Sequence, residues 1–170
     1  DNARAEIIAC VQSMHAVADT LAHVIYFALA MDRNGATKLN ERDVSARSLT
    51  KKLPLGKIRE MVETLKESDG FVYLESLVNH CKHRSLVPIP YHYDLSGEPS
   101  ARQGFWFAEF THDGVSHVAR EVDGYLKAEY ERQSRLVIAI GNVLNDQVRS
   151  SLEGGTREAL GRSSNRLTDA

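Results

Sequence analysis

Residues 73–95 read Tyr73-Leu-Glu-Ser-Leu-Val-Asn-His-Cys-Lys-His-Arg-Ser-Leu-Val-Pro-Ile-Pro-Tyr-His-Tyr-Asp-Leu95, and the hydrophobic period changes within them. In the first half, apolar residues recur every three or four positions, which predicts an amphipathic helix from about Phe71 to His83. In the second half, Val87–Leu95, they alternate with other residues, which predicts a strand. Because Pro88 and Pro90 lack a backbone N–H, we expect this strand at the edge of its sheet.

Helical spacing of apolar residues also occurs before and after this stretch. It predicts a long, mostly buried first helix over Ala3–Met31, stopped by Asn34-Gly35, and another helix that begins near Pro54 and ends at Ser68-Asp69-Gly70. A last helix is expected from about Ala119 to Leu152, because Gly154-Gly155 follows it.

Short β segments are expected before that last helix. Phe105–His112 is rich in aromatic residues, and Asp113-Gly114 is a two-residue turn signal that leads into Val115–Val118. The fold class is therefore mainly α: a bundle of about four helices with a small antiparallel β-hairpin or three-stranded sheet inserted before the last helix. We expect residues 1–154 to form a single domain, with the β insertion at about 87–118, and residues 155–170 to form a mobile polar tail.

The bulk composition limits the classes of function. A net charge of −2 gives no overall attraction for nucleic acid, so a nucleic-acid role requires a local basic patch. Cys10 and Cys81 stand alone, which is typical of free thiols in a reducing compartment, and we expect a cytoplasmic protein. No apolar run approaches the roughly 20 residues of a spanning helix, so no membrane role is expected.

The most polar chemistry of the chain lies at the end of the helix that precedes His83. Asn79, Lys82, His83 and Arg84 are candidate RNA contacts, because cationic side chains bind phosphate oxygens. If the protein is a hydrolase, His83 would be the acid–base and Lys82 or Arg84 would stabilise charge. Without an external partner, these residues are simply a solvated helix end.

Histidines offer two other patterns. His80 and His83 are three residues apart and could share a zinc ion with a strand histidine such as His92. Because no Cys-x-x-Cys or His-Glu-x-x-His accompanies them, we expect no metal and no cofactor.

The first helix carries a second row of polar residues on one side, His15, Asp19 and His23. Its two histidines are about 12 Å apart along the helix axis, too far for one metal ion to bind both, so a hydrogen-bonded polar seam is the favoured interpretation.

The order of elements resembles the HEPN-like group of prokaryotic helical proteins. The resemblance rests on the first-helix stretch His15–Ile25, on Leu53-Pro-Leu-Gly-Lys-Ile58 before a helix, and on Asn79-His-Cys-Lys-His83-Arg, with a long closing helix. It implies a helical bundle, a homodimer, and metal-independent RNA cleavage or RNA binding in a defence or toxin–antitoxin setting. Asn79 and His83 then match the family's polar residue and motif histidine, and Val78 stands where the catalytic arginine belongs.

We therefore expect a non-cleaving, HEPN-like module that binds RNA or a protein partner. Three alternatives stay open: a metal-independent ribonuclease that uses His83, a metal-binding helical bundle, and an interaction subunit without a site.

Overall fold

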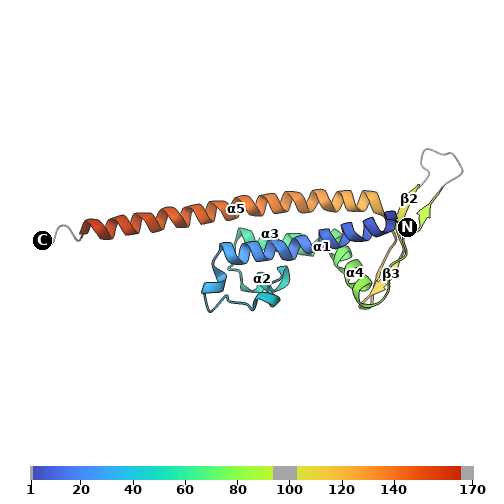
Figure 1. Cartoon of the computed structure of the whole chain (residues 1–170), viewed down its shortest axis with the longest axis horizontal. Helices are drawn as coiled ribbons and strands as arrows, with labels where there is room; N and C mark the ends of the chain where they lie inside the picture. Colours follow the sequence, from blue (N-terminus) through green and yellow to red (C-terminus); the bar gives the residue numbers. More distant parts are fainter. Residues whose placement is uncertain (1, 94–102, 166–170) are drawn as a thin grey trace.

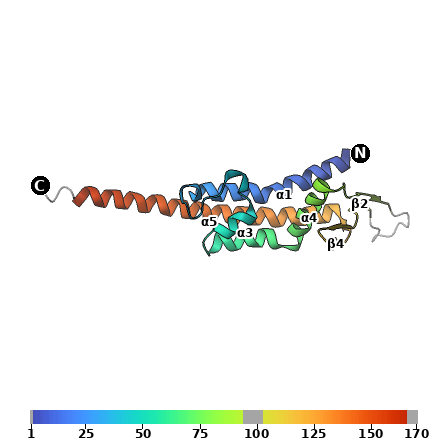
Figure 2. The same ribbon diagram turned by 90° about the horizontal axis from the view of Figure 1, so that it is seen from below.

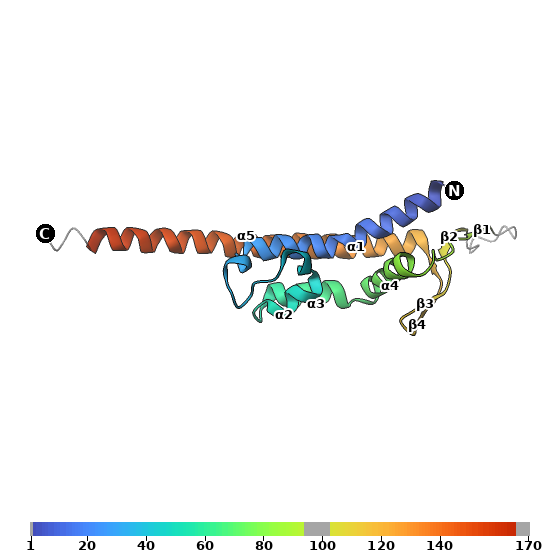
Figure 3. The same cartoon turned by 60° about the horizontal axis from the view of Figure 1, so that its bottom comes forward.

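The computed structural model describes residues 2–93 and 103–165, with side chains as far as Leu152, and it is mainly helical. The five α-helices are α1 (Asn2–Ala28), α2 (Ala46–Lys52), α3 (Lys57–Glu67), α4 (Asp69–His83) and α5 (Val122–Asn165). α1 and α5 lie side by side and run in the same direction, whereas α2, α3 and α4 cover one side of this pair (Figures 1, 2 and 3). The predicted fold class is confirmed, with α2 as an additional short helix in the connector before Pro54.

α1 is the central core helix. Its buried residues follow helical spacing, and they are Val11, Met14, Ala18, Leu21, Ala22, Ile25 and Tyr26. Among the described helices, α1 alone is long and apolar enough to cross a membrane by length and composition, although a core helix meets the same test. The sequence pattern did not predict such a helix.

Two predicted helix ends are wrong. α1 ends at Ala28, where Ala30 adopts a left-handed conformation (φ 50°), and the short 3₁₀ turn η1 follows (Met31–Arg33). α5 continues through Gly154-Gly155 to Asn165. Interior glycines weaken a helix by about 1 kcal/mol each, which is not enough by itself to end one. The last part of the expected polar tail, 166–170, lies outside the described residues.

The β insertion forms two small sheets. β1 (Tyr91–His92), β2 (Gly104–Phe107) and β5 (Arg120–Glu121) make an antiparallel sheet in the order β1-β2-β5, so β1 is an edge strand as predicted. The expected single strand Phe105–His112 is divided, because β3 (Phe110–His112) pairs with β4 (Val115–His117) instead.

The turn between β3 and β4 is the one predicted from the sequence. Asp113 and Gly114 both have positive φ, 48° and 80°, which is the conformation of a tight two-residue hairpin turn. β1 is shorter than the predicted strand, whose last two residues, 94 and 95, lie outside the described part of the chain.

α5 is fixed to the other helices by a buried polar network. Glu129 is 3% exposed and accepts hydrogen bonds from Arg132 (2.5 and 2.8 Å) and from Gln133 (2.8 Å). The same arginine donates to the Leu65 carbonyl (3.1 Å), which lies in the last turn of α3. Gly70 faces this network so closely that an added Cβ would collide with the Glu129 carboxylate. The network therefore joins the start of α4 and the end of α3 to α5.

Candidate functional site

The candidate site at the end of α4 begins with a well-defined helix. Ser68 caps the helix by accepting a hydrogen bond from the Phe71 N–H (3.1 Å). His80, Lys82 and His83 fill the last turn, where positive charge complements the helix dipole. The Arg84 N–H closes the helix by donating to the His80 carbonyl (2.9 Å).

The cationic residues at this end face solvent. Lys82, His83 and Arg84 are exposed, and Asn79 is half-buried. Arg84 forms an ion pair of 3.5 Å with Asp113 in the β3–β4 turn, and both side chains are more than half exposed. An exposed pair of this kind contributes little to stability.

Lys51, Lys52 and Lys57 do not extend this patch. They lie at the end of α2 and the start of α3, away from the end of α4 (Figures 1 and 3).

His80 is held in place by the protein itself. Its Nδ1 donates to the Thr111 carbonyl of β3 (3.1 Å), and its Nε2 lies 3.3 Å from the Ser85 hydroxyl. Its ring also lies 5.4 Å from that of Phe110. Because both ring nitrogens are engaged, His80 orients the end of α4 against β3 and does not reach outward as a ligand.

The alternative metal site is not assembled. Within residues 2–93 and 103–165 no group of three or more His, Cys, Asp or Glu side chains is arranged to hold a metal ion. His83 is exposed, and His92 lies on β1 against Trp106, with 5.7 Å between the ring centroids. The set His80, His83 and His92 therefore does not come together.

The polar row of α1 forms the expected seam. Asp19 accepts a hydrogen bond from the Ala46 N–H (3.1 Å) at the start of α2, and His23 bonds the carbonyl of that aspartate (2.9 Å). His15 stacks on Phe71 of α4, with 5.9 Å between the rings. Burial, and then the nearby Lys82 charge, lower the pKa of His15. These contacts join α1 to α2 and α4, and they leave no pair of histidines facing one ligand.

An aromatic and imidazole cluster that the sequence did not predict joins α4 to the β insertion. Tyr73 contacts Phe107, Phe110, His117 and Tyr125. The Tyr73 hydroxyl is buried without a hydrogen-bond partner in the structure, and burial raises its pKa to about 12. Tyr73 lies next to Leu74 of the predicted apolar face of α4, and this was the signal in the sequence. The buried face is wider than a strict three-and-four spacing predicts, so it includes Tyr73.

Arg120 covers this cluster from the side of β5. Its guanidinium lies 4.2 Å from the Tyr73 ring and forms an ion pair with Asp69 (2.8 Å). The guanidinium of Arg120 is attracted by the negative face of the Tyr73 ring, so each of the two side chains helps to hold the other. The cluster therefore holds the β insertion against the first half of α4.

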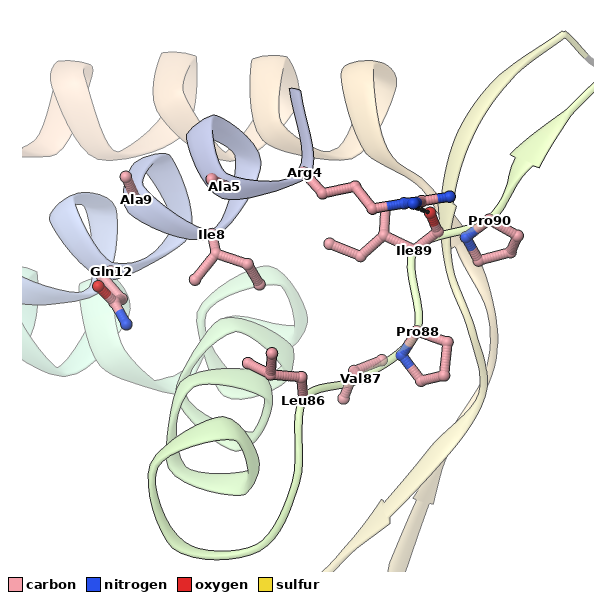
Figure 4. A pocket seen from close by; sticks show the side chains of 10 residues that line it. All are labelled: Arg4, Ala5, Ile8, Ala9, Gln12, Leu86, Val87, Pro88, Ile89 and Pro90. Atoms are coloured by element: carbon pink, nitrogen blue, oxygen red, sulfur yellow. Dashed lines mark hydrogen bonds between the residues drawn. The ribbon is translucent and has the colours of Figure 1, made fainter. Parts of the chain in front are cut away.

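An apolar groove lies next to the end of α4, between the first half of α1 and the extended segment 86–90 (Figure 4). Its volume is about 760 Å³. The lining residues are mostly apolar, and they are Arg4, Ala5, Ile8, Ala9, Gln12, Leu86, Val87, Pro88, Ile89 and Pro90. Arg4 is the single charged side chain of this lining, and its Nε donates to the Ile89 carbonyl (2.9 Å).

The exposed positions of α1 beyond its first two turns carry no charge. From residue 9 to residue 28 they are Ala9, Cys10, Gln12, Ser13, Ala16, Thr20, Val24, Phe27 and Ala28. Val24 and Phe27 are each 51% exposed. A helix face that stays in water usually carries charged or polar residues; this face has Gln12, Ser13 and Thr20 but no charged residue.

Comparison with protein-family models, with curated proteins and with solved structures finds no match to this chain. The resemblance to HEPN-like proteins therefore stays a prediction from the sequence.

Proposed function

We propose that this protein is a non-cleaving RNA-binding module whose contact surface is the end of α4. The observation that carries the proposal is the joint exposure of Lys82, His83 and Arg84 in one helix end. His80 below them is fixed to β3, so the three side chains extend from a rigid base. Phosphate groups are the anions that such a short cationic surface would bind along an RNA strand.

The absence of cleavage follows from the position that the resemblance assigns to an arginine. Val78 stands there, and it is 2% exposed within the core between α4 and its neighbours. No charged group at this position can therefore stabilise a transition state beside His83. The surface is suited to hold RNA and lacks one of the two groups that the resemblance requires for cutting it.

The test is the binding of a fluorescein-labelled single-stranded RNA of about 20 nucleotides, followed by anisotropy across a series of NaCl concentrations. We expect affinity to fall steeply with salt, and Lys82→Ala to reduce the logarithmic salt slope by about 0.7, the value for one lost contact to single-stranded nucleic acid. Arg84→Ala should act in the same way. The RNA should stay intact in the presence of EDTA.

Lys51→Ala is the matched control, because Lys51 is also exposed but lies at the end of α2. Equal losses from Lys51→Ala and Lys82→Ala would mean that any surface cation contributes and that α4 is not the site. Affinity that is absent or insensitive to salt would overturn the proposal. Cleavage without metal that disappears in His83→Ala would establish the ribonuclease alternative instead.

A second candidate is an interaction subunit that forms a homodimer, and the uncharged face of α1 favours it. A second copy is the occupant we consider, because a twofold interface brings the same patch of both subunits together and would bury no unpaired charge here. The exposed stretch of 20 residues is about 30 Å long, and a stable interface needs roughly 800 Å² from each subunit. The face is therefore long enough to form the centre of such an interface.

Sedimentation of the purified protein across a concentration series tests this candidate. We expect a dimer that dissociates when Val24 and Phe27 are both replaced by Glu. The control is Glu at Ala3, which is exposed on the same helix but precedes the uncharged stretch. A wild-type monomer at every concentration, or a dimer that survives both substitutions, would contradict self-association through α1.

A further inference from the structure

Another cavity lies where α1 meets α2, α3 and α4. Its volume is about 490 Å³, which is within the range of small-molecule sites. In contrast to the groove beside residues 86–90, its lining is rich in ionisable side chains from all four helices. The charged residues of this lining are Asp19, Arg47, Lys66, Glu67 and Glu75.

The charges in this lining balance in pairs, with one exception. Arg47 forms an ion pair with Glu75 (3.4 Å), and Lys66 forms one with Glu67 (2.9 Å). Asp19 forms no ion pair within the described part of the chain, and one oxygen of its carboxylate accepts a backbone N–H at the start of α2 (3.1 Å). Its other oxygen has no partner among the described residues. The cavity therefore carries one negative charge without a counter-charge.

His15 also lines this cavity, one helical turn before Asp19 on the same side of α1. Its half-buried ring stacks on Phe71, but neither ring nitrogen forms a hydrogen bond with any residue that the structure describes. Burial, followed by the charge of Lys82, lowers the pKa of His15, although Asp19 and Glu75 act in the opposite direction. At neutral pH the imidazole is therefore mainly uncharged, and one of its nitrogens can accept a hydrogen bond.

We propose that this cavity binds a small organic cation that carries one positive charge and a compact apolar part. The charged group, an ammonium or an amidinium, donates hydrogen bonds to the second oxygen of Asp19 and to the acceptor nitrogen of His15. The apolar part contacts Val72, which lines the cavity and is 42% exposed. Covering this side chain removes apolar surface from water, which adds to the affinity.

Charge selects this class of ligand over neutral and anionic ones. A cation completes the charge balance of the lining, whereas a neutral ligand leaves Asp19 without a counter-charge and an anion is repelled by it. Arg47 and Lys66 do not reverse this preference, because each is already paired with a glutamate. The cavity is a different site from the RNA contacts proposed at the end of α4, and it is tested without RNA.

The probe is benzylamine, a monocation at neutral pH, titrated into the full chain while the ring resonances of His15 are followed by NMR. Its controls are benzyl alcohol, which has nearly the same shape without the charge, and benzoate, which has the opposite charge. We expect benzylamine to bind at least about tenfold more tightly than benzyl alcohol, a difference of roughly 1.4 kcal/mol. Benzoate should leave the His15 resonances unchanged.

Protein variants locate the site. Asp19→Asn keeps an acceptor for the backbone N–H of α2 and removes only the charge, so it should weaken benzylamine binding at least about tenfold and leave benzyl alcohol unaffected. Glu60→Gln is the matched control, because Glu60 is exposed on α3 outside the lining. Val72→Lys, at an exposed position of the lining, should also weaken benzylamine binding, because it adds a second cation there. Lys82→Ala should weaken RNA binding alone, since Lys82 does not line the cavity.

Three results would overturn the proposal. Equal affinity for benzylamine and benzyl alcohol, or tighter binding of benzoate, would mean that Asp19 does not select the ligand. Equal effects of Asp19→Asn and Glu60→Gln would place the amine elsewhere on the protein. No binding of benzylamine, with the His15 resonances unchanged, would mean that the cavity does not accept an organic cation.

Discussion

Glu129 shows how strongly a single buried charge can determine the docking of a helix. Its side chain is 2% exposed and receives hydrogen bonds from Arg132 and Gln133. Glu129→Ala would remove the carboxylate that pairs with Arg132 and leave this cation unpaired beside the α3 carbonyls. We expect a loss of about 3–5 kcal/mol of unfolding free energy, measured by urea denaturation.

The control for Glu129→Ala is on the same helix. Glu131 also pairs with an arginine, Arg135, at 3.5 Å, but the two side chains are 48% and 80% exposed. Glu131→Ala should change the unfolding free energy by at most about 1 kcal/mol. Similar losses from the two substitutions would mean that burial of the Glu129 pair is not what stabilises the docking of α5.

The sequence predicted which residue types gather at the end of α4 but not which residues they contact. The exposure of Lys82 and His83 follows from their place outside the apolar stripe. His80 belongs to the same helical turn, yet its ring is held by Thr111, which is 31 residues away along the chain. Only the folding of β3 against α4 creates this contact, and no local pattern encodes it.

The attachment of the β3–β4 hairpin should depend on pH. Phe110 lies between His80 and His117, and its ring stacks on His117 at 4.7 Å. Burial, followed by the charges of His112 and Arg120, lowers the pKa of His117 below its usual 6.5, although Asp69 acts in the opposite direction. The folded state therefore binds a proton at His117 less readily than the unfolded chain does.

Below about pH 6.5 the unfolded state binds more protons at His117, so stability falls as pH falls. We expect the urea midpoint to decrease between pH 7 and pH 5, and His117→Gln to reduce that decrease. Part of it should remain, because the pKa of His15 is lowered as well.

His83→Gln is the control for the His117 substitution, since His83 is exposed. It should leave the pH dependence of the midpoint as in the wild-type protein. A wild-type midpoint that is constant between pH 7 and pH 5 would contradict the role assigned to His117.

The hydrophobic period predicted most of the helices and strands. It predicted the strand Phe105–His112 and the end of α5 wrongly, and both errors have physical causes. Within the described part of Val87–Leu95, the alternation correctly indicated an edge strand, β1, and Asp113-Gly114 correctly indicated a hairpin turn. Phe105–His112 could not be divided from sequence, because no Gly, Pro, Asn or Asp separates its halves, which differ in the strand with which each pairs. Similarly, Gly154-Gly155 predicts a helix end, but the backbone of α5 continues through both glycines.

The stability of the helical bundle should not depend on the projecting end of α5. Among the described side chains, Leu144 is the last buried residue of the chain, and the helix continues far beyond the other helices (Figure 1). A chain that ends at Leu152 should therefore unfold within about 0.5 kcal/mol of the full chain in urea.

A shorter truncation provides the contrast. A chain that ends at Asn142 loses Leu144 and should be destabilised by about 2–5 kcal/mol, as for removal of a buried leucine. Unfolding of the chain that ends at Leu152 would mean that the projecting part of α5 contributes to the core.

Because α1 and α5 run in the same direction, the projecting end of α5 marks one end of the molecule, and resonance energy transfer between attached dyes can locate it. α5 has 44 residues, which at 1.5 Å per residue is roughly 66 Å. If two copies join along α1, a twofold axis perpendicular to the helices places the projecting ends of the two α5 helices at opposite ends of the dimer. A twofold axis parallel to the helices places both α5 ends at the same end of the dimer. Donor and acceptor dyes on Ser151→Cys, in a background that lacks Cys10 and Cys81, would distinguish the two arrangements by resonance energy transfer.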